Sequence, residues 1–263
     1  MRSQIWAFFK KDFLMASSYK LNFILSYLGI FFSVFSFFFI AKLVPSSAVS
    51  EYGGDYFSFV LIGIAASNFI GLAQHGFASI LREMQSMGTI EILFSSRTKL
   101  STILIGSSIW GYLNSFLNVI IYFIFGIFMF NAHINMNITV LFILLLNTLC
   151  FQAIGLIAAS MTIIYKKGDP FNWVFGTLSS LLAGTLYPLT VLPQWLQHIA
   201  EFLPLTHALR ATRFAALKGY SLISLWGDIL FLVVFAAIAF PLGLMLFKYA
   251  LKKARRDGSL MKY

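Results

Sequence analysis

The sequence predicts an all-α membrane protein forming a single domain over residues 1–263, and three observations support this fold class. First, 59% of the 263 residues are hydrophobic and only 11% are charged, with a mean hydropathy of +0.85, as is typical of polytopic membrane proteins. Second, Lys and Arg gather at the ends of the apolar runs. Third, six runs are long enough to form transmembrane helices: 22–43, 56–80, 102–130, 138–164, 171–191 and 225–247.

Residues 3–17 precede the first run and predict an interfacial helix lying in the plane of the membrane. Lys10 and Lys11 lie away from its apolar side, toward anionic headgroups, and Asp12 at the edge is a flaw in the pattern. The alternative is an extension of the first span, which the polar residues at 17, 18 and 20 disfavour. The apolar side consists of Ile5, Trp6, Phe8, Phe9 and Phe13.

The distribution of Lys and Arg predicts the orientation of the chain. Fifteen of the 19 fall in segments on the same side as the N-terminus, and this excess marks the cytoplasmic side. We therefore expect a multi-pass protein of the plasma (inner) membrane with both termini in the cytoplasm. Because the net charge of +10 is confined to the ends of apolar runs, we do not attribute it to nucleic-acid binding. The four outward cations are Lys42, Arg210, Arg213 and Lys218.

A polar segment from Arg82 to Lys99 interrupts the apolar sequence. No Asp, Glu, Lys or Arg occurs from Tyr56 to Leu81 or from Leu100 to Tyr165. Gly88 is expected to end one helix, and Thr89 to cap another that has Glu91 in its first turn. The segment is either an ordinary loop between spans or a short amphipathic helix docked into a partner protein.

Residues 184–220 combine apolar and polar residues in a way that does not fit a water-exposed loop. Pro188, Pro193 and Pro204 interrupt the apolar sequence, and Trp195 and its neighbours recur at amphipathic spacing. One interpretation is a re-entrant hairpin in the outer leaflet, which is tolerated where it is buried in protein or lines a cavity. The other is a surface helix with Trp195 as its interfacial anchor.

Neutral polar residues inside the predicted spans have two interpretations. Asn114 and Asn118 are four residues apart and share a helix face, so they could line a substrate path. Alternatively, such residues form hydrogen bonds between helices, worth about 0.6–2 kcal/mol each. The full set is Asn68, Gln74, Asn114, Asn118, Asn147 and Gln152.

Motifs for catalysis are missing from the sequence. No Gly-Lys dipeptide occurs, so there is no Walker A phosphate loop. Cys150 is the single cysteine, and neither a paired-Cys nor a His-Glu-x-x-His zinc pattern occurs. The four scattered His residues are typical of structural groups. The lack of a carboxylate in the middle of a span argues against a proton-coupled transporter.

Several motifs in this order resemble the permease subunit of type-2 ATP-binding-cassette (ABC) exporters, and the resemblance covers nearly the whole chain. The first is Glu83-x-x-x-x-Gly88-Thr89-Ile90-Glu91 in the polar segment. The others are Tyr187-Pro188-Leu-Thr-Val-Leu192-Pro193-Gln-Trp195-Leu196, Leu203-Pro204-Leu205-Thr206-His207-Ala208-Leu209-Arg210 and the ending Ala254-Arg255-Arg256-Asp257-Gly258-Ser259-Leu260.

The resemblance implies a dimer of permeases, expected to be identical, above two separate ATPase subunits that bind ATP and Mg²⁺. This chain itself is then expected to hold no cofactor, metal or catalytic residue and to be no enzyme. Residues 80–96, here named the coupling segment, would insert into the ATPase through Arg82, Glu83, Gly88, Thr89 and Glu91. Residues 184–220, the outer region, would form a re-entrant gate with Tyr187, Pro188, Leu192, Pro193 and Trp195.

The resemblance favours export of a hydrophobic or amphiphilic compound, either a drug or a lipid. Export of a lipid-linked polysaccharide or a teichoic acid by the same mechanism is the first alternative. An ion-coupled secondary transporter acting alone is an alternative of a different class. No constellation of residues supports a third class, an intramembrane enzyme.

Overall fold

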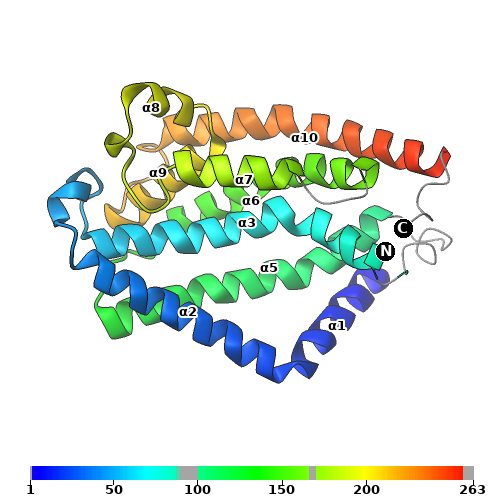
Figure 1. Cartoon of the computed structure of the whole chain (residues 1–263), viewed down its shortest axis with the longest axis horizontal. Coiled ribbons are helices and arrows are strands. Elements are labelled where there is room, and N and C mark those ends of the chain that lie inside the picture. Colours follow the sequence, from blue (N-terminus) through cyan, green and yellow to red (C-terminus); the bar gives the residue numbers. More distant parts are fainter. Residues whose placement is uncertain (1, 87, 89–99, 166–169, 257–263) are drawn as a thin grey trace.

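The computed structural model describes residues 2–86, 88, 100–165 and 170–256, and these form helices joined by short turns (Figure 1). No β-strand occurs among the described residues. The α-helices and the shorter η segments, of which η2 is a π-helix, are α1 (Arg2–Ser18), α2 (Lys20–Ala41), η1 (Ser46–Tyr52), α3 (Tyr56–Ser86), α5 (Leu100–Ile124), η2 (Phe125–Met129), α6 (Ile138–Tyr165), α7 (Pro170–Leu182), η3 (Leu189–Val191), α8 (Gln194–Ala200), α9 (Pro204–Leu217) and α10 (Trp226–Arg256).

Helices α3 and α6 form the centre of the bundle. Their membrane-span candidates are 67% and 56% buried, against 11% for α2 and 22% for α5 and α10. Gly155 on α6 explains the close approach, because a Cβ there would lie 2.6 Å from the Ala73 carbonyl oxygen of α3. Gly243 lets α10 approach α6 in the same way, with a Cβ 2.9 Å from the Ala153 carbonyl oxygen. Small residues therefore set the helix spacing, as expected within a membrane.

Five of the six predicted spans are confirmed as helices long and apolar enough to cross a membrane. The fifth, 171–191, is not confirmed among the described residues. Its helix α7 has 13 residues, which makes it about 20 Å long where the hydrocarbon core is about 30 Å thick. The chain turns at Gly184, whose φ of +69° is a left-handed conformation that favours glycine.

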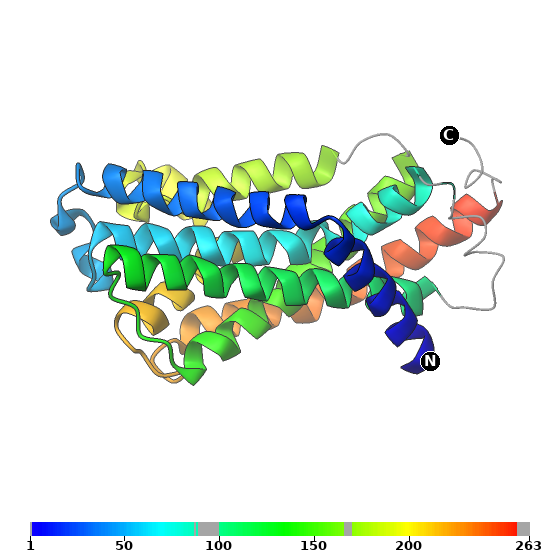
Figure 2. The ribbon, with the colours of Figure 1, turned by 90° about the horizontal axis from the view of Figure 1, so that it is seen from below.

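The two ends of the bundle hold different parts of the chain. The N-terminal end of α1 and the C-terminal ends of α3 and α10 lie at one end, on the right in Figure 1. Segments η1 and α8 lie at the opposite end, as both views show (Figures 1 and 2). The first end is here named the terminal end, and the other the outer end. The predicted topology requires this separation.

The polar turn after η2 is tied to α9 and α3 at the outer end. Asn135 donates a backbone hydrogen bond to the Ala216 carbonyl oxygen at 2.7 Å. The Asn137 side chain donates to the Ala215 carbonyl oxygen at 3.2 Å. The backbone N–H of His133 donates to Ser58 Oγ at 3.0 Å. These bonds fix α9 against the ends of α3 and α6.

Candidate functional site

The described part of the coupling segment is the last part of α3. Arg82 is half-buried and Glu83 is exposed. Helix α3 has 31 residues and is therefore about 46 Å long, which exceeds the roughly 30 Å of the hydrocarbon core. Gly88 has a φ of +64°, a left-handed conformation that favours glycine. Thr89 and Glu91 lie outside the described residues.

Helix α1 packs its apolar side partly against α5. Trp110 makes edge-to-face contacts with Phe9 and Phe13, with ring centroids 6.1 and 5.1 Å apart. A Cβ at Gly106 would lie 2.9 Å from the Cβ of Phe8, so α1 and α5 are in close contact. The predicted helix is confirmed, while its position in the membrane plane stays a prediction. Asp12, the flaw in the pattern, pairs with Lys11 at 2.9 Å.

The predicted gate residues lie at the outer end, in the turns between α7 and α9. Pro188 and Leu192 are in extended backbone conformation on either side of η3. Pro193 immediately precedes α8. The Tyr187 hydroxyl donates to the Leu181 carbonyl oxygen at the end of α7. Trp195 on α8 is 65% exposed. The five residues lie within one short stretch of the chain, and its helix α8 is at the end of the bundle opposite the C-terminal end of α3 (Figure 1).

Arg213 holds the outer region to α3, and the sequence analysis missed this role. The side chain is 2% exposed and donates to the carbonyl oxygens of Gly184 at 2.8 Å, Thr185 at 2.6 Å and Phe59 at 3.3 Å. Its guanidinium carbon lies 3.6 Å from the centroid of the Phe59 ring, which adds a cation–π contact. Burial lowers the pKa of Arg213 to about 9, so the group is charged at neutral pH.

Two further bonds join α3 directly to the outer region. Tyr56 donates from its hydroxyl to the Leu186 carbonyl oxygen at 2.8 Å. The hydroxyls of Ser67 and Thr185 are 3.4 Å apart. Together with Arg213, these bonds connect α3 to three consecutive residues of the outer region, Gly184 to Leu186.

A charged cluster joins the end of α8 to α9 and α10. His207 Nδ1 is 2.6 Å from Asp228 Oδ1, and its Nε2 is 2.9 Å from the Glu201 carbonyl oxygen. Arg210 pairs with the carboxylates of Glu201 and Asp228. Burial acts to lower the pKa of Arg210, but these two carboxylates outweigh it and raise that pKa. The structural interpretation of the histidines is confirmed for His207, which also stacks on Phe231.

Most of the polar residues inside the spans form hydrogen bonds between helices, which confirms that interpretation for them. Asn114 and Asn118 are half-buried on α5, and no hydrogen bond from either side chain occurs among the described residues. Their role in a substrate path stays a prediction. The four donors and their acceptors are Asn68 to Tyr122 (3.1 Å), Gln74 to Asn172 (3.4 Å), Asn147 to Thr212 (3.4 Å) and Gln152 to Tyr112 (2.8 Å).

Comparison with known proteins identifies the family of this chain. The family model described as ABC-2 type transporter matches residues 3–217. ABC transporter G family member 20 of Dictyostelium discoideum is 28% identical over 156 residues, which are 58% of this chain and 21% of that protein. The chain thus matches about a fifth of the length of this relative. The family match covers most of the spans, the described part of the coupling segment and residues 184–217 of the outer region, and the chain therefore belongs to the ABC-2 type transporter family.

Proposed function

We propose that this chain is the permease subunit of an ATP-driven ABC exporter, working as a dimer above two ATPase subunits that bind ATP and Mg²⁺. The observation that supports this most strongly is the family match over residues 3–217. The similar Dictyostelium protein is itself named an ABC transporter. The absence of a Walker A motif is the reason for assigning ATP hydrolysis to a partner.

The coupling segment is proposed to transmit ATPase movement into the permease. Arg82 and Glu83 lie at the terminal end of a helix long enough to project beyond the membrane. This end also holds the basic end of α10, with Lys248, Lys252 and Lys253. The excess of positive charge supports a cytoplasmic location for the terminal end. The membrane that the chain spans is proposed to be the plasma membrane. A movement of the coupling segment would therefore act on α3 directly.

The outer region is proposed to be the re-entrant gate that this movement opens. Helix α3 is continuous from Tyr56 to Ser86 and is bonded to the outer region through Arg213 and Tyr56. A displacement of α3 at its terminal end therefore acts on residues 184–186 at the opposite end. A gate at this end would release the substrate away from the ATPase, which is the direction of export.

The proposed substrate is a hydrophobic or amphiphilic compound, a drug or a lipid. The chain exposes large apolar side chains on α2, α5 and α10, so a substrate of this kind can reach the permease from the bilayer. Asn114 and Asn118 on α5 are proposed to line its path.

The substitution Glu91→Lys tests the coupling proposal. In a reconstituted complex, we expect ATP hydrolysis to continue while transport of a fluorescent lipid or drug is lost, because the charge reversal alters only the contact with the ATPase. Glu51→Lys is the matched control, since Glu51 is an exposed carboxylate of η1 at the outer end, and it should transport normally. Normal coupling in the Glu91→Lys variant would contradict the assignment of this segment.

A further inference from the structure

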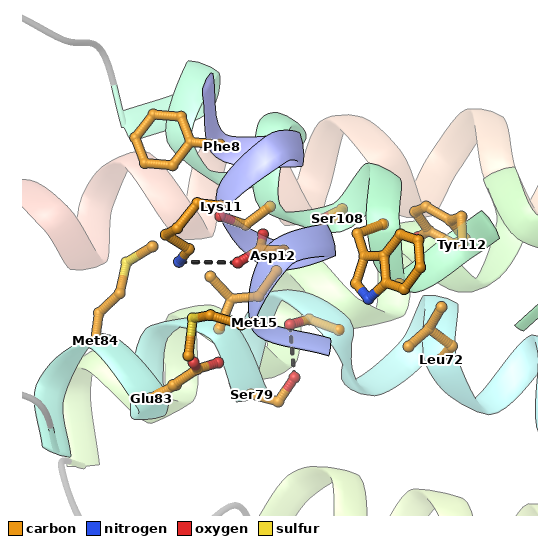
Figure 3. A pocket seen from close by; sticks show the side chains of 15 residues that line it. Phe8, Lys11, Asp12, Met15, Leu72, Ser79, Glu83, Met84, Ser108 and Tyr112 are labelled. Carbon is orange, nitrogen blue, oxygen red and sulfur yellow. Dashed lines mark hydrogen bonds and ion pairs between the residues drawn. The ribbon is translucent and has the colours of Figure 1, made fainter. Parts of the chain in front are cut away.

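A cavity of about 550 Å³ lies between α1, α3 and α5, and its lining differs in character along its length. The lining runs along α3 from Leu72 to Met84, a distance of about 18 Å. Figure 3 shows Lys11, Asp12 and Glu83 toward the Met84 side and Tyr112 near Leu72. Its volume is within the range of about 300–1,000 Å³ that accommodates drug-sized ligands.

The charged part of the cavity contains a buried acceptor without a donor. Lys11 Nζ pairs with Asp12 Oδ1 at 2.9 Å. The second carboxylate oxygen, Asp12 Oδ2, is buried and has no hydrogen-bond partner among the described residues. Glu83 also lines the cavity. A buried oxygen without a donor is costly, and a ligand that brings an N–H donor removes this cost.

The remainder of the lining suits an apolar ligand body. Leu72 and Tyr112 lie away from the charged groups, while Phe8 and Met15 add apolar surface beside them (Figure 3). Trp110 contributes further aromatic surface. Aromatic faces are also favourable neighbours for a cation. A phosphate or carboxylate oxygen on the ligand could not donate to Asp12 Oδ2 and would leave this buried acceptor without a partner.

We propose that this cavity is a binding site for a lipophilic amine in its protonated form, with the ammonium donating to Asp12 Oδ2 and the apolar body directed along α3 toward Leu72. The ligand is a monocation without a phosphate group, which distinguishes it from a phospholipid headgroup. The site lies between α1 and the part of α3 that enters the coupling segment. It is formed by this chain alone and does not depend on the exporter proposal.

Photolabelling of the full chain in lipid nanodiscs tests the site. The probe is a long-chain primary amine that carries a diazirine near the end of its alkyl chain, and labelled peptides are identified by mass spectrometry. We expect labelling on α1, α3 and α5 that an excess of dodecylamine suppresses. The matched neutral alcohol, dodecanol, should suppress it at least about tenfold less effectively, because it lacks the charge-assisted hydrogen bond.

Two pairs of variants test two properties of the site separately: whether it recognises the charge of the amine, and whether the probe occupies the cavity. Asp12→Asn should weaken labelling about tenfold, and Glu51→Gln, at the outer end, should leave it unchanged. Gly76 lines the cavity and has no heavy atom within 4 Å of a built Cβ, so Gly76→Leu should fill the space and abolish labelling. Gly71 on the same helix is equally open at its Cβ but does not line the cavity, so Gly71→Leu is the matched control.

The proposal is overturned if dodecanol competes as well as dodecylamine, or if Gly76→Leu and Asp12→Asn label like the unmodified chain. Labelling confined to lipid-exposed peptides of α2 or α10 overturns it as well. Gel filtration establishes that each variant is folded, and the Asp12→Asn pair decides the outcome if Gly76→Leu fails to fold. Because the ATPase is absent from this assay, its result is separate from that of the coupling test.

Discussion

At the scale of single residues, Arg213 illustrates how a charge count along the sequence can mislead. Fifteen cations on one side and four on the other predict an orientation, but the count treats each cation as solvent-exposed. Arg213 is instead one of the largest fully buried side chains. A signal was available, since Leu209 and Arg213 are four residues apart on the buried side of α9. Three backbone carbonyl groups compensate for its burial.

We expect Arg213→Met to destabilise the fold. The change removes the donor from the Gly184 and Thr185 carbonyl oxygens, whereas the Phe59 carbonyl keeps its hydrogen bond within α3. Each buried oxygen that loses its donor costs about 1–3 kcal/mol, so the free energy of unfolding should fall by about 2 kcal/mol or more. Thermal unfolding in detergent measures this. Arg256→Met, at an exposed position of α10, is the control and should unfold like the unmodified chain. Equal stability of the two variants would contradict the anchoring role of Arg213.

Gly63 supports the same anchor from α3. A Cβ at this position would lie 2.3 Å from the Thr185 carbonyl oxygen and 2.4 Å from Arg213 Nη2, so we expect Gly63→Ala to lower the melting temperature by several degrees. Gly71→Ala adds the same methyl group to the same helix where no heavy atom lies within 4 Å. Its melting temperature should be unchanged or higher, because Ala favours helix more than Gly does. A melting temperature for Gly63→Ala as high as that of Gly71→Ala would show that the close approach can be relieved.

At the scale of elements, hydropathy predicts the position of spans well and the end of a helix less well. The predicted run 56–80 lies in α3, which continues to Ser86. The helix extends beyond the apolar sequence because its backbone hydrogen bonds do not depend on the polarity of the side chains. The run 171–191 contains α7 but exceeds it, since an apolar sequence does not distinguish a helix from a buried turn. Gly184, two residues after Leu182, is the signal for that turn.

The outer region gives the prediction that belongs to this scale. If it is a re-entrant gate, cysteines placed at Leu192 and Leu196 should react poorly with a bulky, membrane-impermeant maleimide, because lipid and the second permease copy cover them. Glu51→Cys, exposed at the same end, is the control and should react rapidly. The native Cys150 is fully buried and leaves the background low. Rapid labelling at both test positions would favour the surface helix with Trp195 as its anchor.

At the scale of the whole molecule, the sequence predicts the arrangement of the candidate sites better than their internal geometry. The coupling segment and the outer region were expected on opposite sides, and the described part of each lies at opposite ends of the bundle (Figure 1). The bonds from Arg213 and Tyr56 that connect α3 to the outer region join residues more than 120 positions apart. Such contacts depend on how helices pack, and no local sequence pattern specifies them.

The most direct test of the central claim, that this chain works with a separate ATPase, is purification of the tagged chain from its own membranes in mild detergent, with mass spectrometry of the proteins that accompany it. The exporter proposal predicts a stoichiometric partner that contains a Walker A motif, recovered with the tagged chain. A chain that purifies alone as a stable dimer, and transports without ATP, would contradict the claim and favour an ion-coupled transporter.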